Sequence, residues 1–160
     1  MAGPVTLRTA SLADCELVFD WANDPVTRAM SFNQAQITRA EHVAWFAASL
    51  DDERRQMFVA EDEAGALALV RFSAYEHRPD AAEIGINLAP QRRGQGLGRA
   101  VLELASTEAA RRGIRRLIAR IRPENAASQR AFQRAGYELR AEEPIGEIVA
   151  LRYEIDQQNR

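Results

Sequence analysis

The segment 91–98, Gln-Arg-Arg-Gly-Gln-Gly-Leu-Gly, has the residue types and spacing of a phosphate-binding loop. It lies between an apolar, strand-like run and an amphipathic helical pattern, so N–H groups at the start of that helix lack intrahelical acceptors. The glycines let a ligand approach the backbone closely, and the helix dipole adds partial positive charge. The arginine side chains add planar donors suited to phosphate oxygens. The segment therefore predicts a site for a ligand that contains phosphate groups.

Two common nucleotide-binding loops differ from this segment. Its spacing is neither Gly-x-Gly-x-x-Gly nor Gly-x-x-x-x-Gly-Lys-Ser/Thr, and all 21 basic residues of the chain are arginine. The absence of lysine also excludes Schiff-base chemistry. His42 and His77 are far apart in the sequence and there is one cysteine, so we expect no metal site.

Length and composition predict a globular protein with a single domain over residues 1–160. Hydrophobic residues make up 46% of the chain and charged residues 28%, and the formal net charge of −2 argues against a nucleic-acid binder. No apolar run approaches the ~18 residues of a membrane span, and the first residues lack the apolar core of a signal peptide. With Cys15 as the lone cysteine, these features predict a cytoplasmic protein without a membrane partner or an internal disulfide.

The elements that would position the loop alternate along the chain between strands and helices. Period-two and helical-period patterns, with caps and breakers at their ends, set the boundaries. We expect helices over 11–24, 38–50, 97–112 and 126–135, and a loop or short helical turn over 26–36. We expect strands over 5–8, 57–60, 66–72, 82–88, 117–121, 137–140 and 148–155. This order predicts an α/β (α+β) domain with a mostly antiparallel start and a strand–helix–strand core.

Two motifs in the second half of the chain resemble those of the GNAT superfamily of acetyl-CoA-dependent N-acetyltransferases. The family's loop, [Gln/Arg]-x-x-Gly-x-[Gly/Ala], is filled by Gln91, Gly94 and Gly96. Its second motif, Asn-x-x-Ser/Ala-x-x-x-aromatic-x-x-x-Gly-aromatic, is filled by Asn125, Ser128, Phe132, Gly136 and Tyr137. The resemblance covers the whole chain. It implies a mixed, mostly antiparallel twisted sheet of about six or seven strands, flanked by about four helices, with a V-shaped splay between the fourth and fifth strands.

The resemblance also implies where the co-substrate acetyl-CoA would bind. A bulge would splay strand 82–88 away from strand 117–121, and pantetheine would lie in the resulting V. There it would pair with the backbone of the first strand at Ile86, Asn87 and Leu88. The pyrophosphate would rest on the N–H groups of Arg93, Gly94, Gln95, Gly96, Leu97, Gly98 and Arg99. Asn125 and Ser128 would face the pantetheine, and Phe132 would pack beside its thiol arm.

Acetylation of an amine requires a neutral nucleophile and an oxyanion donor. By analogy with the family, the backbone N–H of Leu88 is the expected donor. Glu83 is the expected base, acting directly or through water, because it lies on the cofactor strand and shares a face with Gly85 and Asn87. The alternative is that Glu83 is a solvated strand residue.

The departing thiolate also needs a proton, and here the chain departs from the commoner pattern. Many relatives have a tyrosine where Phe132 stands, and phenylalanine has no proton to donate. Ser128 is the candidate replacement, with pantetheine contact alone as its alternative role. Tyr137 is expected to pack in the interior, and a bound water or the absence of any dedicated acid also remain open.

The N-terminal half is where an amine acceptor would be recognised. Asn-Asp-Pro-x-x-Arg at 23–28, Ser-Phe at 31–32 and Glu-His-x-x-Trp-Phe at 41–46 are similar to a GNAT branch that acetylates ribosomal-protein alanine, spermidine or UDP-4-amino sugars. This similarity favours a UDP-amino sugar, with a protein N-terminus or a polyamine as alternatives. Arg28 would contact phosphate. Four aromatic residues would stack on the acceptor, namely Trp21, Phe32, Trp45 and Phe46. The alternative is that three of them anchor amphipathic helices in the core: Trp21, Trp45 and Phe46.

Other interpretations stay open from the sequence. A non-catalytic acyl-CoA-binding module would keep the loop and Asn125 but lose the acceptor cleft. His42 is expected as a partly exposed structural imidazole, with a base as the alternative, and His77 as an exposed residue of the polar connection 75–80. Relatives are often dimers through their last strands, and the apolar segment 148–155 allows a homodimer.

Overall fold

The computed structural model describes residues 3–75 and 77–159, so Glu76 of the predicted polar connection lies outside the described residues. The strands are β1 (Thr6–Thr9), β2 (Arg55–Asp62), β3 (Gly65–Ala74), β4 (Ala81–Leu88), β5 (Arg116–Ile121), β6 (Glu138–Ile145) and β7 (Ile148–Asp156). The helices are α1 (Cys15–Ala22), α2 (Pro25–Met30), α3 (Arg39–Asp51), α4 (Leu97–Arg111) and α5 (Ala126–Arg134). Short 3-10 turns lie at Leu12–Asp14, Pro90–Arg92 and Gln157–Asn159.

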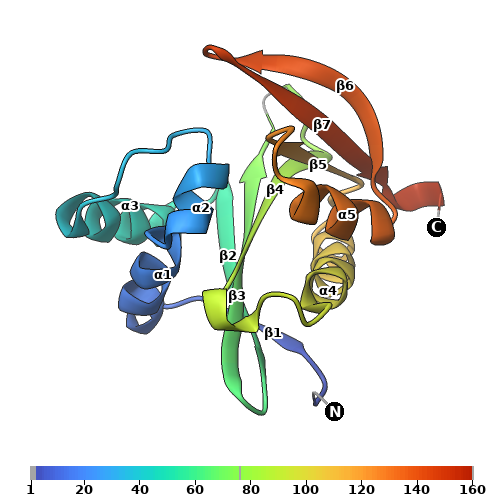
Figure 1. The fold of residues 1–160 in the computed structure, drawn as a ribbon. Coiled ribbons are helices and arrows are strands. Elements are labelled where there is room, and N and C mark those ends of the chain that lie inside the picture. The colour runs from blue at the N-terminus through green and yellow to red at the C-terminus, as the bar shows by residue number, and fades with distance from the viewer. Residues whose placement is uncertain (1–2, 76, 160) are drawn as a thin grey trace.

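The strands form one seven-stranded sheet in the order β1-β2-β3-β4-β5-β7-β6. Every neighbouring pair is antiparallel except β4 and β5. Helices α1, α2 and α3 lie to one side of the strands, and α4 and α5 lie to the other (Figure 1). The predicted mixed, mostly antiparallel sheet is confirmed. Among the described residues, no helix has both the length and the apolar character needed to cross a bilayer.

Strands β4 and β5 pair over only three residues, from Ala81 opposite Arg116 to Glu83 opposite Ile118. Beyond Glu83, β4 continues along β3 as far as Leu88, whereas β5 continues along β7 as far as Ile121. The two strands part because each follows a different neighbour. The predicted V is confirmed, but the predicted bulge is wrong, since the register of β3 with β4 runs without a shift.

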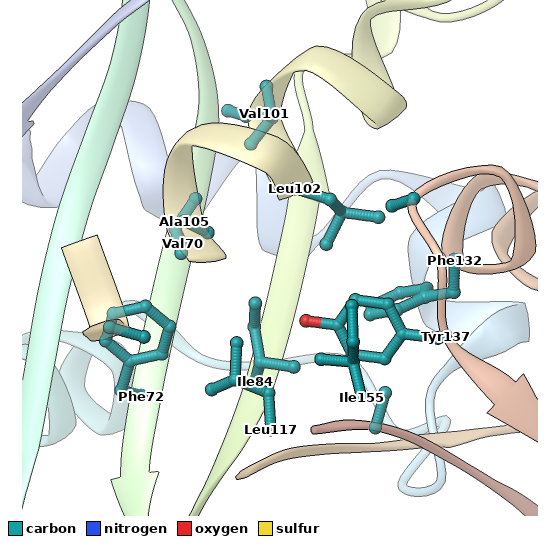
Figure 2. Close-up of a cluster of buried hydrophobic side chains, with 14 of the residues drawn as sticks. Val70, Phe72, Ile84, Val101, Leu102, Ala105, Leu117, Phe132, Tyr137 and Ile155 are labelled. Carbon is teal, nitrogen blue, oxygen red and sulfur yellow. The ribbon is translucent and has the colours of Figure 1, made fainter. Parts of the chain in front are cut away.

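The main core fills the space between the sheet and the pair α4 and α5. Val101 and Leu102 of α4 point toward Ile84 of β4 and Leu117 of β5, and Phe132 of α5 closes the cluster (Figure 2). The buried positions of α4 recur every three or four residues, which is the period of a helix with one apolar face. This packing fixes α4 against β4, and so fixes the loop that joins them.

Two elements differ from the sequence expectations. The segment after Asp24 was expected to be a loop or a short helical turn, and it forms the helix α2. The helix is favoured because the Asp24 carboxylate accepts a hydrogen bond from the Thr27 amide (3.1 Å) and Pro25 occupies the first turn. Strand β6 extends five residues beyond the predicted 137–140. The sequence of its second half lacks the alternation of apolar residues that would have predicted a strand. Glu143 in this half forms ion pairs with Arg120 and Arg152.

Candidate active site

The loop between β4 and α4 has two glycines in the left-handed backbone region. Gly94 and Gly96 both have φ of +73°, a conformation that a residue with a Cβ rarely adopts. A Cβ added to either residue would meet no atom within 4 Å. The loop backbone is therefore open to a ligand at both positions, and Gly96 is the N-cap residue directly before α4.

The backbone donors of this loop are free. Within the part of the chain that the structure describes, the amides of Gly94, Gln95 and Gly96 donate no hydrogen bond. They precede the first turn of α4, whose N–H groups also lack intrahelical acceptors. The Arg93 amide, in contrast, has a long bond to the Pro90 carbonyl (3.4 Å). Free amides at a helix N-terminus suit an anion, and the loop therefore fits a pyrophosphate through its backbone.

The arginine side chains of the loop, which were expected to offer donors to phosphate, have partners within the protein. Arg92 forms an ion pair with Asp62, and its guanidinium holds the pKa of that carboxyl below its ordinary value. The Arg93 guanidinium lies 2.8 Å from Asp24 and donates to the Thr27 hydroxyl (2.7 Å).

Arg99, at the start of α4, is also engaged, because its Nε donates to Glu103 one turn along the helix (2.8 Å). The three guanidinium groups therefore have partners within the loop, in α2 or β2, or in the helix that follows the loop.

Gly98 has a packing role. A Cβ at this position would lie 3.2 Å from the Ala131 Cβ and 3.9 Å from the Leu88 Cδ1. The missing side chain lets α4 approach α5 and the end of β4. Leu97 is buried beside it. These two predicted cofactor-binding residues can offer a ligand their amides alone.

The strand β4 directs part of its backbone into the V. The Ala89 amide donates to the Leu67 carbonyl (2.8 Å), in line with β3. Because amides alternate in direction along a strand, those of Leu88 and Ile86 point to the other edge, toward β5. At these positions β5 has already diverged, as its pairing with β4 ends at Glu83. The amides of Leu88 and Ile86 therefore face the gap where pantetheine and the oxyanion are predicted.

The start of α5 lies across this gap. The Asn125 side chain caps the helix by accepting a hydrogen bond from the Ser128 amide (3.1 Å). The Ser128 hydroxyl forms no hydrogen bond within the described ranges, 3–75 and 77–159. Phe132, one turn further, is 3% exposed and packs edge-on against Tyr137, with 4.9 Å between ring centroids. Phe132 and Tyr137 thus belong to the core. The Phe132 ring has little exposed surface for the expected contact with the thiol arm.

Glu83 lies on the opposite face of β4, toward the helices α1–α3. Its side chain is 40% exposed and forms an ion pair with Arg120 of β5. Arg120 also donates to the Tyr75 hydroxyl (3.2 Å) and to Glu143 (2.9 Å). With Arg152, it holds the pKa of the Glu143 carboxyl below its ordinary value. Glu83 is therefore oriented at the base of the V and remains reachable from solvent, as a base would need to be.

Sequence reasoning missed Arg120, the partner that orients Glu83. The available signal was a charged side chain in the apolar run 117–121. It also missed Arg71, which interrupts the apolar strand β3 in the same way.

Arg28 corrects the expectation of a phosphate contact. Its guanidinium donates to the carbonyls of Ala22 (2.7 Å) and Asn33 (2.8 Å) and to the Ser31 hydroxyl (3.1 Å). It therefore organises the segment after α2. Asn23 adds to this order by bonding both the amide and the carbonyl of Ile37.

The aromatic residues and histidines of this half divide between core and surface. Trp21 and Phe46 are buried in the smaller core cluster beneath α1 and α3, so they anchor helices. Trp45 and Phe32 are half-buried, and Trp45 packs against the edge of the same cluster. His42 is buried, not partly exposed, and its Nε2 lies 2.8 Å from the Cys15 carbonyl, so the structural interpretation holds.

His77 is exposed, as expected for the polar connection. Among the described residues, no group of three acidic, histidine or cysteine side chains could hold a metal ion.

Comparisons with known proteins match this geometry. The family described as Acetyltransferase (GNAT) domain matches residues 5–138. YwnH of Bacillus subtilis, whose name proposes phosphinothricin as its substrate, is 32% identical over 138 residues, which is 83% of each chain. An L-methionine sulfoximine/L-methionine sulfone acetyltransferase of Pseudomonas aeruginosa is 28% identical over 149 residues, 87% of this chain and 83% of that protein. The structure of spermidine N-acetyltransferase from Vibrio cholerae in complex with CoA and spermine has the same fold, with a TM-score of 0.86, 18% identity and 96% of each chain covered.

Proposed function

The chain belongs to the GNAT acetyltransferase family and is an acyltransferase, and we propose that it transfers the acetyl group of acetyl-CoA to the primary amine of a small molecule. The observation that supports this proposal most is the open loop at Gly94 and Gly96, whose free amides adjoin the V between β4 and β5. Pyrophosphate on that loop would direct the rest of the co-substrate into the V.

The residues around the V fit acetyl-CoA in a stated order. The amides of Gly94, Gln95 and Gly96 would hold the pyrophosphate, together with the first turn of α4. The amides of Ile86 and Leu88 face the gap and would bind polar groups of the pantetheine and the thioester oxygen. The co-substrate supplies the activated acetyl group, and the protein supplies the contacts that orient it.

The chemistry then needs three groups of the chain. Glu83 would accept the proton of the attacking amine, directly or through water. The Leu88 amide would stabilise the oxyanion, a contact that contributes about 3–4 kcal/mol in other acyl-transfer enzymes. Ser128 would relay a proton from water to the departing thiolate, since Phe132 has none to give. The protonated Glu83 would return its proton to water, so that both side chains end in their starting states. Attack by the amine is direct, so no acyl-enzyme intermediate is required.

The acceptor is a small molecule in this proposal, because the relatives above are named for small amines. Phosphinothricin and methionine sulfoximine are amino acids, and spermine is a polyamine. A UDP-amino sugar remains a candidate. Arg28, which was expected to contact its phosphate, does not support it, because the Arg28 guanidinium donates to backbone carbonyls of the protein. The half-buried rings of Trp45 and Phe32 retain surface for either kind of acceptor.

An acceptor screen tests this function. Release of CoA thiol would be followed with acetyl-CoA and one amine at a time: L-methionine sulfone, a UDP-4-amino sugar, spermidine and a peptide with an N-terminal alanine. We expect turnover with at least one small molecule. Turnover of the peptide alone would contradict a small-molecule acceptor.

Thermal shifts test the donor in the same preparation. We expect acetyl-CoA and CoA to raise the melting temperature more than ATP or NAD do. Preference for ATP or NAD would contradict acetyl-CoA as the donor. Strong acetyl-CoA binding without transfer to any amine would instead indicate a non-catalytic acyl-CoA-binding module.

A further inference from the structure

Arg71 lies on the sheet face that the acceptor would approach. In the register of β3 with its neighbours it stands opposite Gly85 of β4 and Met57 of β2. Directly paired residues project to the same face, so Arg71 shares the face of Glu83, Gly85 and Asn87. Its Nη2 lies 3.0 Å from the place where a Cβ on Gly85 would be. The missing side chain of Gly85 therefore leaves the space that the Arg71 guanidinium occupies.

The Arg71 guanidinium has no polar partner within residues 3–75 and 77–159, where it forms neither a hydrogen bond nor an ion pair. Its contact is the Trp45 ring, with 5.6 Å from the guanidinium carbon to the ring centroid. Other arginines of the candidate site bond to oxygen atoms of the protein, among them Arg28, Arg92, Arg93, Arg99 and Arg120. Arg71 thus differs from them in having donors free for an outside group.

A cavity of about 120 Å³ adjoins this guanidinium. Its lining residues are Trp45, Ser49, Arg55, Met57, Arg71, Phe72 and Ser73. They include two arginines, two serine hydroxyls and no carboxylate. Arg55 donates to the Ser49 hydroxyl (3.2 Å) and lies 3.7 Å from the Asp52 carboxylate, so its charge already has a partner. Arg71 is thus the arginine of this lining with donors left for an anion, and the Glu83 carboxylate acts on it through electrostatics alone.

We propose that Arg71 binds an anionic group, a carboxylate or a phosphate, of the amine acceptor. This inference rests on the proposed function, because it assigns a substrate class to the same site. Arg71 is opposite Gly85, three residues before Leu88, which is about 10 Å along the strand. In an α-amino acid the carboxylate and the amine are attached to the same carbon, so a carboxylate on Arg71 would hold the nitrogen beside Gly85, between Glu83 and Leu88. An amino sugar linked to a phosphate separates the two groups by more bonds and could reach further along the strand towards the thioester.

The proposal makes Arg71 a specificity-determining residue. A guanidinium offers two parallel donors to a carboxylate or phosphate and repels a polyamine. Amino acids and nucleotide-linked amino sugars therefore belong to the accepted class. Spermidine and neutral amines belong outside it.

Matched acceptor pairs test this assignment in the enzyme loaded with CoA or acetyl-CoA. The carboxylate pair is L-methionine sulfone and its primary amide. The phosphate pair is a UDP-4-amino sugar and the free amino sugar, and spermidine is the cationic probe. Each probe is given to the wild type, to Arg71→Gln, to Arg71→Lys and to Arg54→Gln. The last variant is the control, since Arg54 is a neighbouring arginine with 78% of its side chain exposed.

We expect the wild type to prefer the anionic member of at least one pair by about tenfold or more in kcat/KM, the effect of one charge-assisted contact. Arg71→Gln should remove that preference through KM, Arg71→Lys should restore part of it, and Arg54→Gln should keep it. The KM for acetyl-CoA should not change in any variant. The pair that shows the preference identifies the source of the anion.

Binding decides the inference independently of turnover. In thermal shifts with CoA present, the anionic probes should stabilise the wild type and not Arg71→Gln. That result without any acetyl transfer would support the anion site and count against the proposed function. Equal stabilisation of both proteins, no stabilisation by any anionic probe, or a preference for spermidine or the neutral amines would overturn the inference.

Discussion

Arg93 and Asp24 form an ion pair that joins the two halves of the candidate site. The Arg93 Nη1 lies 2.8 Å from the Asp24 Oδ2, and both side chains are partly shielded from solvent. Arg93 belongs to the loop that would bind pyrophosphate, and Asp24 caps α2 in the half that would recognise the acceptor. Burial acts to raise the pKa of the Asp24 carboxyl, but Arg93 and the amides of α2 outweigh it and lower that pKa.

Asp24→Asn tests this connection because asparagine is as good a helix cap as aspartate. The substitution keeps the bond to the Thr27 amide and removes the charge that pairs with Arg93. A partly exposed ion pair contributes up to about 1 kcal/mol, so we expect KM for acetyl-CoA to rise by about two- to fivefold. Steady-state kinetics measure this, with melting temperature as the check on folding. An unchanged KM would show that the loop keeps its shape without the ion pair.

Gly96→Val tests the phosphate loop. Valine is strained at a φ of +73° and would place its methyl groups in the open space above the loop. We expect KM for acetyl-CoA to rise by at least about tenfold, the equivalent of ~1.4 kcal/mol. Gly113→Val is the matched control. Gly113 has a φ of +79° and an equally open environment, but it lies after the far end of α4. Both variants should lose stability. An equal effect on KM in both would contradict the assigned loop.

Glu83→Gln tests the base. We expect kcat to fall by about 100-fold and the acid limb of the pH–rate profile to change, because glutamine cannot accept the amine proton. The measurement is kcat against pH with the best acceptor. Arg120→Gln is the control, since it breaks the same ion pair while leaving the carboxylate in place. If both variants lose activity equally and keep the wild-type pH profile, Glu83 has a structural role only.

Ser128→Ala tests the proton donor. Loss of the hydroxyl should lower kcat by about 100-fold if serine protonates the thiolate, with little change in KM for acetyl-CoA. Ser128→Thr keeps a hydroxyl and should retain most of the activity. The amide that bonds to Asn125 is unaffected by either change. Near-normal kcat in Ser128→Ala would mean that serine only contacts pantetheine and that another group or water supplies the proton.

The order of elements could be predicted from the sequence because local signals mark most boundaries. The capping box at Thr38 and Glu41, the Asn125 cap and the glycine after α4 all act within a few residues of their helices. The splay of β4 from β5 was predictable only by resemblance. It depends on which neighbour each strand follows after Glu83, and no local pattern encodes that choice.

The roles of the arginine side chains were harder to predict, because the sequence does not show which arginine is paired with a carboxylate and which is free to bind a ligand. Arg28, Arg92 and Arg93 were expected to meet phosphates, and each is instead paired inside the protein. Arg71 was not singled out, yet its guanidinium has no polar partner among the described residues. The difference arises from contacts between residues far apart in the chain, such as Arg93 with Asp24, and these exist only in the folded protein.

The most direct test of the central claim is mass spectrometry of the acceptor after incubation with the protein and acetyl-CoA. The account predicts that a small primary amine gains one acetyl group on its nitrogen, with one CoA released for each, and that the product is absent when CoA replaces acetyl-CoA. Acetyl-CoA that stays intact, or that loses its acetyl group to water while every amine in the panel remains unchanged, would contradict the account.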